Sequence, residues 1–123
     1  YAYEITQHTI QAEPDLAGIY VASNGQQGVC QALDELGLKR RIKVIAFDLN
    51  APNLALLQAD SLSFVLDQEA FEQGYRSPYL LYEYLMHKKK PAHPLIYTDI
   101  AIRTKYNSTL AVSADADGHM QQT

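Results

Sequence analysis

Short, nearly continuous apolar runs alternate along this chain with segments whose apolar residues recur every three or four positions. The first pattern predicts buried strands and the second predicts amphipathic helices. Because strands and helices alternate, and the strands are too far apart for hairpins, the strands should lie parallel. The sequence therefore predicts an α/β fold, a three-layer, mainly parallel open sheet flanked by helices. We expect strands at 16–22, 42–48 and 62–66, and helices at 1–11, 26–36, from Asn50 onward and at 69–87.

The last third of the sequence departs from this regular alternation. The helix over 69–87 carries a continuous apolar stripe, but Pro78 removes a backbone donor from its middle. We therefore expect this helix to kink, or to end a first segment, near Arg76. A linker over 88–94 leads to a final strand at 95–104 with two unlike faces. Beyond it the composition becomes polar and aperiodic, so we expect a loose C-terminal tail at 107–123.

Composition narrows the function classes. A chain of 123 residues with 47% apolar residues predicts one globular unit, without the long apolar run of a membrane span. The net charge of -4 argues against direct binding of nucleic acid by this chain. A single cysteine, Cys30, allows no internal disulfide, and the four histidines have no metal-type spacing. No nucleotide-binding motif occurs, so neither a metal nor a cofactor is expected.

The best candidates for function are polar residues that end the predicted strands. Asp48 and Gln68 each follow a buried strand, and ligands of open α/β sheets are held at the carboxyl ends of strands. A carboxylate can accept hydrogen bonds from two vicinal hydroxyls, and an amide can both donate and accept. The alternatives are structural, because Asp48 could cap the next helix, Gln68 could simply start one, and Asp67 is expected to cap the helix after it.

A third place for ligand contacts is the turn after the first strand, which carries Ser23 and Asn24. Asn followed by Gly is also typical of tight turns, so this signal is weak by itself. No catalytic group is identified, because no nucleophile or second titrating residue accompanies Asp48 in the predicted sheet edge. The candidate ligand-binding set is therefore Asp48, Gln68, Asn24 and Ser23.

Four segments in order, GIYVASNGQQGVCQALDELGL, IKVIAFD, LSFVLDQEAFEQGY and TDIAIRTKYNS, resemble the closing part of the lactose-repressor and periplasmic sugar-binding (type 1) superfamily. The resemblance covers about residues 1–108. It implies that 1–106 form an incomplete C-terminal lobe, that the helix at 69–88 belongs to the other lobe, and that an N-terminal lobe precedes Tyr1. Without that lobe, the apolar stripe is expected to fold back onto its own sheet or to pair with a second copy.

The same resemblance implies roles for individual residues. Asp48 matches the family's ligand-binding aspartate at the end of a strand, and Gln68 matches its hinge glutamine. Asn24 matches less well, because alignment on Gly28 places Ala22 at the ligand position. Each of these roles is an expectation that the resemblance supplies.

For function, the resemblance implies the effector-sensing region of a lactose-repressor-type transcriptional regulator. Such a protein would be a cytoplasmic homodimer that binds a sugar-like small molecule, and operator DNA through a domain absent from this chain. The first alternative is a periplasmic sugar-binding protein of an ABC transporter. The second is an α/β enzyme that uses Asp48 as an acid or base, which lacks a visible partner group. We therefore expect binding without catalysis.

Overall fold

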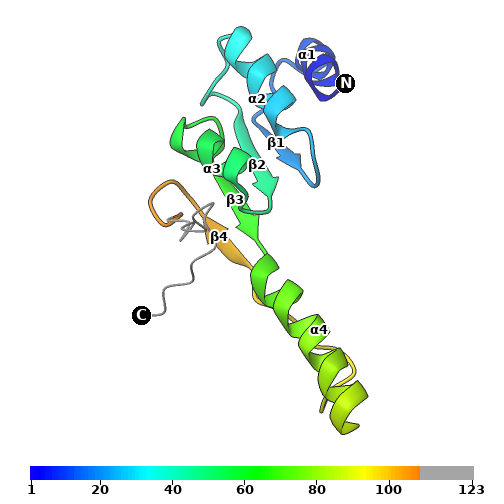
Figure 1. Ribbon diagram of the computed structural model, residues 1–123. Helices are drawn as coiled ribbons and strands as arrows, with labels where there is room; N and C mark the ends of the chain where they lie inside the picture. Colours follow the sequence, from blue (N-terminus) through cyan, green and yellow to red (C-terminus); the bar gives the residue numbers. More distant parts are fainter. Residues whose placement is uncertain (109–123) are drawn as a thin grey trace.

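The computed structural model describes residues 1–108, and it confirms the α/β class and the expected alternation of elements (Figure 1). The tail expected at 107–123 lies outside the described residues except for its first two positions. The four strands form one open sheet in the order β1-β2-β3-β4. The elements in chain order are α1 (Ala2–Ala12), β1 (Gly18–Val21), α2 (Gln26–Glu35), β2 (Lys43–Phe47), α3 (Ala51–Gln58), β3 (Phe64–Asp67), α4 (Ala70–His87) and β4 (Ala101–Arg103).

The first three strands are parallel, and their register brings their carboxyl ends to one edge of the sheet. Val21 pairs with Ala46, which in turn pairs with Val65. Because side chains alternate between the two faces of a strand, these residues share the face that is covered by helices. The intervening residues, such as Ile45 and Phe64, are only half-buried. The core comprises Val29, Cys30, Leu33, Ile42, Val44, Ala46, Leu57, Leu62 and Val65.

Helices α1 and α2 pack closely because a glycine lies between them. A Cβ atom placed on Gly28 would lie 3.0 Å from the backbone nitrogen of Tyr3. The Tyr3 hydroxyl donates a hydrogen bond to the Glu35 carboxylate, and Gln7 Nε2 donates to the Tyr3 hydroxyl at 2.9 Å. The bond between Tyr3 and Glu35 raises the pKa of the Tyr3 phenol and lowers the pKa of the Glu35 carboxyl. These contacts fix the start of α1 beside α2.

Helix α4 projects away from the sheet as one continuous element (Figure 1). Of the two alternatives expected for Pro78, a kink or the end of a first segment near Arg76, the second is wrong, because the helix runs through Pro78 to His87. Both Pro78 and Gly74 are exposed, so water can hydrate the carbonyl that lost its donor. The expectation that the helix folds back onto its own sheet is also wrong for the single chain, since none of its residues is buried.

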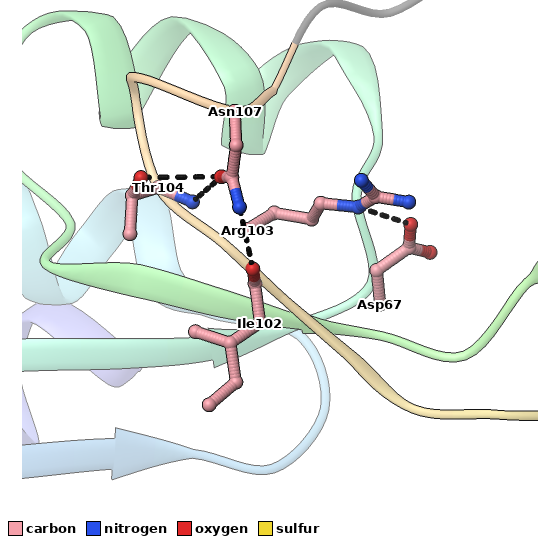
Figure 2. Close-up of polar contacts among 5 residues, drawn as sticks. All are labelled: Asp67, Ile102, Arg103, Thr104 and Asn107. Carbon is pink, nitrogen blue, oxygen red and sulfur yellow. Dashed lines mark hydrogen bonds and ion pairs between the residues drawn. The ribbon is translucent and has the colours of Figure 1, made fainter.

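The last strand is shorter than the sequence suggests. Only Ala101–Arg103 form β4, which pairs antiparallel with β3, and 95–100 join no strand among the residues that the structure describes. Arg103 Nε bonds to Asp67 Oδ2 at 3.2 Å, and Asn107 Nδ2 donates to the carbonyl of Ile102 at 3.0 Å (Figure 2). Asp67 therefore secures β4, and the expectation that it caps the next helix is wrong.

Candidate functional site

Asp48 lies directly after β2 in a backbone conformation that few residues adopt. Its φ is 67°, in the left-handed region, which Asp tolerates better than most side chains do. Its backbone N–H donates to the carbonyl of Leu66 at 2.8 Å, so the end of β2 remains joined to β3. The side chain is half-buried at the carboxyl edge of the sheet. This position leaves the carboxylate beside the core and within reach of solvent.

Gln68 follows β3 and contacts Asp48 directly. Its Nε2 donates a hydrogen bond to Asp48 Oδ1 at 2.7 Å, across the two neighbouring strand ends. The two side chains that the sequence predicts at one edge are therefore brought together by the parallel pairing of β2 and β3. Within residues 1–108, no donor is bonded to Asp48 Oδ2 or to Gln68 Oε1. The pair thus offers two adjacent oxygen acceptors.

The backbone carbonyl of Gln68 accepts hydrogen bonds from α4 and from the segment that precedes β4. Gln73 Nε2, in the first turn of α4, donates to the Gln68 carbonyl at 2.7 Å and to Thr98 Oγ1 at 3.1 Å. Thr98 Oγ1 also donates to the Gln68 carbonyl, at 3.2 Å. The returning segment before β4 is therefore tied to the segment that leaves β3. Glu69, which lies between Gln68 and the start of α4, has a φ of 55°, and this angle turns the chain sharply into the helix.

Asn50 supplies the cap of α3, so the capping alternative for Asp48 is wrong. Asn50 Oδ1 accepts a hydrogen bond from the backbone N–H of Asn53 at 2.9 Å, and Pro52 follows in the first turn. Gln68 does not cap α4 either, because Glu69 occupies that position and makes no side-chain capping bond. Asp48 is thus free of the capping role that competed with ligand binding, whereas Gln68 directly precedes the cap position of α4 and remains open to the alternative of a polar residue at a helix start.

Asn53 is a residue of this site that sequence reasoning missed. Its side chain is 0% exposed, and its Nδ2 donates to the carbonyl of Phe47 at 3.0 Å and to that of Asp48 at 2.8 Å. The available signal was its spacing, because Asn53 stands four positions before the buried Leu57 and hence on the inward face of α3. A polar residue on that face requires a buried partner.

Ser23 and Asn24 are not joined to Asp48 or Gln68 by any hydrogen bond in the described part of the chain. Both side chains are exposed in the turn after β1. Asn24 lines a separate hollow of about 380 Å³ near the first residues of α1, α2 and α3. The structure therefore brings together two of the four candidate residues, and it leaves a ligand contact by the other two as a prediction.

A larger groove, of about 550 Å³, lies at the opposite ends of β2 and β3 and is lined by Lys43, Ser63 and Tyr106 among others. Asp60 in this groove contacts Arg40 and bonds to Lys105 Nζ at 2.6 Å. The bond from Lys105 lowers the pKa of the Asp60 carboxyl. The Asp60 carboxylate is thus already engaged by two cations, and the groove lies at the other ends of the strands from Asp48, so we do not assign the ligand to it.

Residues 1–108 hold neither a cluster of metal ligands nor a membrane-spanning helix. No three His, Cys, Asp or Glu side chains gather there as a metal site would require. In the same range, no helix combines the length and the apolar character needed to cross a membrane. The site thus consists of neutral and acidic hydrogen-bonding groups.

An open α/β sheet with hydrogen-bonding side chains at the carboxyl ends of parallel strands defines a class of domains that bind small molecules. The family model described as "Periplasmic binding protein domain" matches residues 1–89. The chain belongs to this family, which confirms the resemblance found in the sequence. No curated protein matches the chain.

Three solved structures illustrate the likeness. GanP, a glucose-galactose binding protein from Geobacillus stearothermophilus, is 21% identical, with a TM-score of 0.78 over 89% of this chain. An ABC transporter solute binding protein from Agrobacterium vitis with bound D-fucose is 24% identical, with a TM-score of 0.78 over 89%. A carbohydrate transporter solute binding protein from Agrobacterium radiobacter, in complex with D-arabinose, is 25% identical, with a TM-score of 0.75 over 88%. The chain spans only 39%, 38% and 36% of these structures, respectively.

Proposed function

We propose that this chain is part of one lobe of a two-lobe sugar-binding protein, in which Asp48 and Gln68 hold hydroxyl groups of the ligand. The observation that carries this proposal is the 2.7 Å hydrogen bond that places the two side chains together at the carboxyl edge of β2 and β3. Asp48 Oδ2 and Gln68 Oε1 then accept hydrogen bonds from neighbouring hydroxyls of a sugar ring. Such a site binds its ligand without chemical change.

The opposite side of the ligand would be held by a lobe outside this chain. Support comes from α4, whose 18 residues include none that is buried. Phe71 is 85% exposed, and it stacks in a row with Tyr75 and Tyr79 at ring-centroid distances of 6.3 and 6.0 Å. An apolar face of this size is rare on a complete monomer and is typical of an interface. We propose that α4 and the segment 88–100 dock on the other lobe and that the chain near Gln68 acts as the hinge.

For the biological role, we propose the delivery of a sugar to a transporter in the periplasm. The support is the nature of the similar structures, which include transporter solute binding proteins with bound D-fucose and D-arabinose. The comparisons give no support to the transcriptional regulator, the operator DNA or the homodimer that the sequence suggested. A cleavable signal peptide upstream of residue 1 would agree with the transport role, whereas an upstream helix-turn-helix would assign the domain to a regulator.

The test is ligand-dependent stabilisation of the complete two-lobe protein. Thermal unfolding is measured with D-arabinose, D-fucose and D-allose, the sugars bound by structurally similar proteins. A sugar present at 100 times its dissociation constant stabilises the folded state by about 2.7 kcal/mol, which raises the midpoint by several degrees. Asp48→Ala should abolish this shift. Asp15→Ala, which removes an exposed carboxylate before β1, should retain it.

Two outcomes contradict the proposal. If a broad sugar panel produces no shift in the parent protein, the assignment to sugar binding is wrong. If Asp48→Ala keeps the full shift, a sugar binds but at a different place.

A further inference from the structure

We propose that Asn53 is a positioning residue for the ligand site, which holds the Asp48 carboxylate in its binding orientation. This inference rests on the proposed function, because it names a further residue of the same site. Asn53 lies on α3 and reaches under the strand end, so it does not touch the ligand itself. Its contribution is to set the backbone from which the Asp48 side chain projects.

The argument begins with the two hydrogen bonds from Asn53 Nδ2. The carbonyl of Phe47 belongs to the peptide unit before the Asp48 Cα, and the carbonyl of Asp48 belongs to the unit after it. Nδ2 donates to the first at 3.0 Å and to the second at 2.8 Å. Because the peptide units are planar, fixing both of them fixes φ and ψ of Asp48. The bond from the Asp48 N–H to Leu66 at 2.8 Å holds the first unit from the other side.

The conformation held in this way needs support. Asp48 has a φ of 67°, in the left-handed region that residues other than Gly seldom adopt, although Asp tolerates it better than most. If its backbone relaxed to the extended region, the carboxylate would point in a different direction and would lose its bond to Gln68. The contact between the two binding side chains therefore depends on the backbone angle, and the backbone angle depends on Asn53.

Asn53 is also a costly residue to place in this core. It is 0% exposed, and its Oδ1 has no hydrogen-bond partner among the described residues. An unsatisfied buried oxygen is destabilising, and a leucine with the same branching would avoid that penalty. A purely space-filling role does not explain an amide at this position. The two donated bonds do explain it.

The experiment compares sugar affinity with stability in the complete protein. Asn53→Leu keeps the branching of the side chain but removes both donors, and Asn53→Ala is the second variant if leucine disturbs packing. Leu57→Val, one turn further along the buried face of α3, is the matched control for a general loss of helix packing. The probe is whichever of D-arabinose, D-fucose and D-allose stabilises the parent most, titrated by calorimetry.

We expect both Asn53 variants to bind the sugar about tenfold more weakly, as the loss of one net hydrogen bond would produce, while Leu57→Val binds like the parent. The variants are also made in an Asp48→Asn background. If Asn53 acts through the carboxylate, its replacement should weaken binding less than about twofold there, because the group that it positions is already impaired.

Several results overturn the inference. Affinities of both folded Asn53 variants within twofold of the parent would exclude a positioning role, as would an equal loss for Leu57→Val. If replacing Asn53 weakens sugar binding by the same factor in the parent and in the Asp48→Asn protein, the effect is a general structural one. If the folded parent protein binds no sugar, the proposed function is refuted as well. This outcome differs from the others because in those the parent protein does bind a sugar.

Discussion

Replacement of Gly28 by alanine tests how closely α1 and α2 must approach. In most helices this substitution stabilises, because alanine is favoured over glycine by about 1 kcal/mol at an interior position. Here the new Cβ would meet the Tyr3 backbone nitrogen at 3.0 Å and the Ala2 Cβ at 3.4 Å. A backbone atom cannot rotate away, so α1 has to move.

The magnitude follows from these two opposing effects. Overpacking of a closely packed contact costs about 1–3 kcal/mol, and the helix propensity of alanine returns about 1 kcal/mol. We therefore expect Gly28→Ala to lower the free energy of unfolding by roughly 1 kcal/mol. The same displacement moves the first residues of α1, which line the hollow beside Asn24.

The assay is urea denaturation followed by far-ultraviolet circular dichroism, since the chain has no tryptophan to report by fluorescence. Gln27→Ala is the matched control, because Gln27 is the exposed neighbour of Gly28 on the same helix and should change stability by less than about 0.5 kcal/mol. Gly74→Ala is the second control, as no atom lies within 4 Å of the new Cβ and helix content should rise. If Gly28→Ala is as stable as the parent or more so, the reasoning about this contact is wrong.

Two further predictions concern ionisable groups. Cys30 is 5% exposed, and burial raises the pKa of its thiol to about 11, so it should resist a disulfide reagent at pH 8 and react in denaturant. Rapid labelling of the native protein would contradict this burial. The pKa of the Asp60 carboxyl is lowered in the folded protein, so its ion pairs stabilise the fold at any pH above the carboxyl's pKa in the unfolded chain, which is about 4. This stabilisation is lost as the pH falls below that value and through the folded-state pKa. Asp60→Asn should therefore lose less unfolding free energy than the parent when the pH is lowered below about 4. An equal loss in the two proteins would show that these ion pairs do not contribute to stability.

The prediction of the fold succeeded where a local pattern was sufficient. The apolar run Val44–Phe47 ends abruptly at Asp48, and the structure places β2 at Lys43–Phe47 with Asp48 directly after it. The final strand was predicted less well, since only Ala101–Arg103 of 95–104 pair with β3. Alternation is a local property, whereas a strand needs a neighbour with free backbone groups. Residues 95–100 have no such neighbour among the described residues.

The sequence by itself determined the parallel α/β order, and with it the placement of Asp48 and Gln68 at one edge, because strand direction follows from strands that alternate with helices. Only the tertiary structure decided which nearby side chain caps α3, that Asp67 bonds to Arg103, and that Asn53 donates to both carbonyls around Asp48. The cap is a local contact for which the sequence offers two neighbouring candidates, whereas the bonds of Asp67 and Asn53 join residues from different elements. Periodicity predicts which face a residue occupies, but the partner it meets depends on how the elements pack.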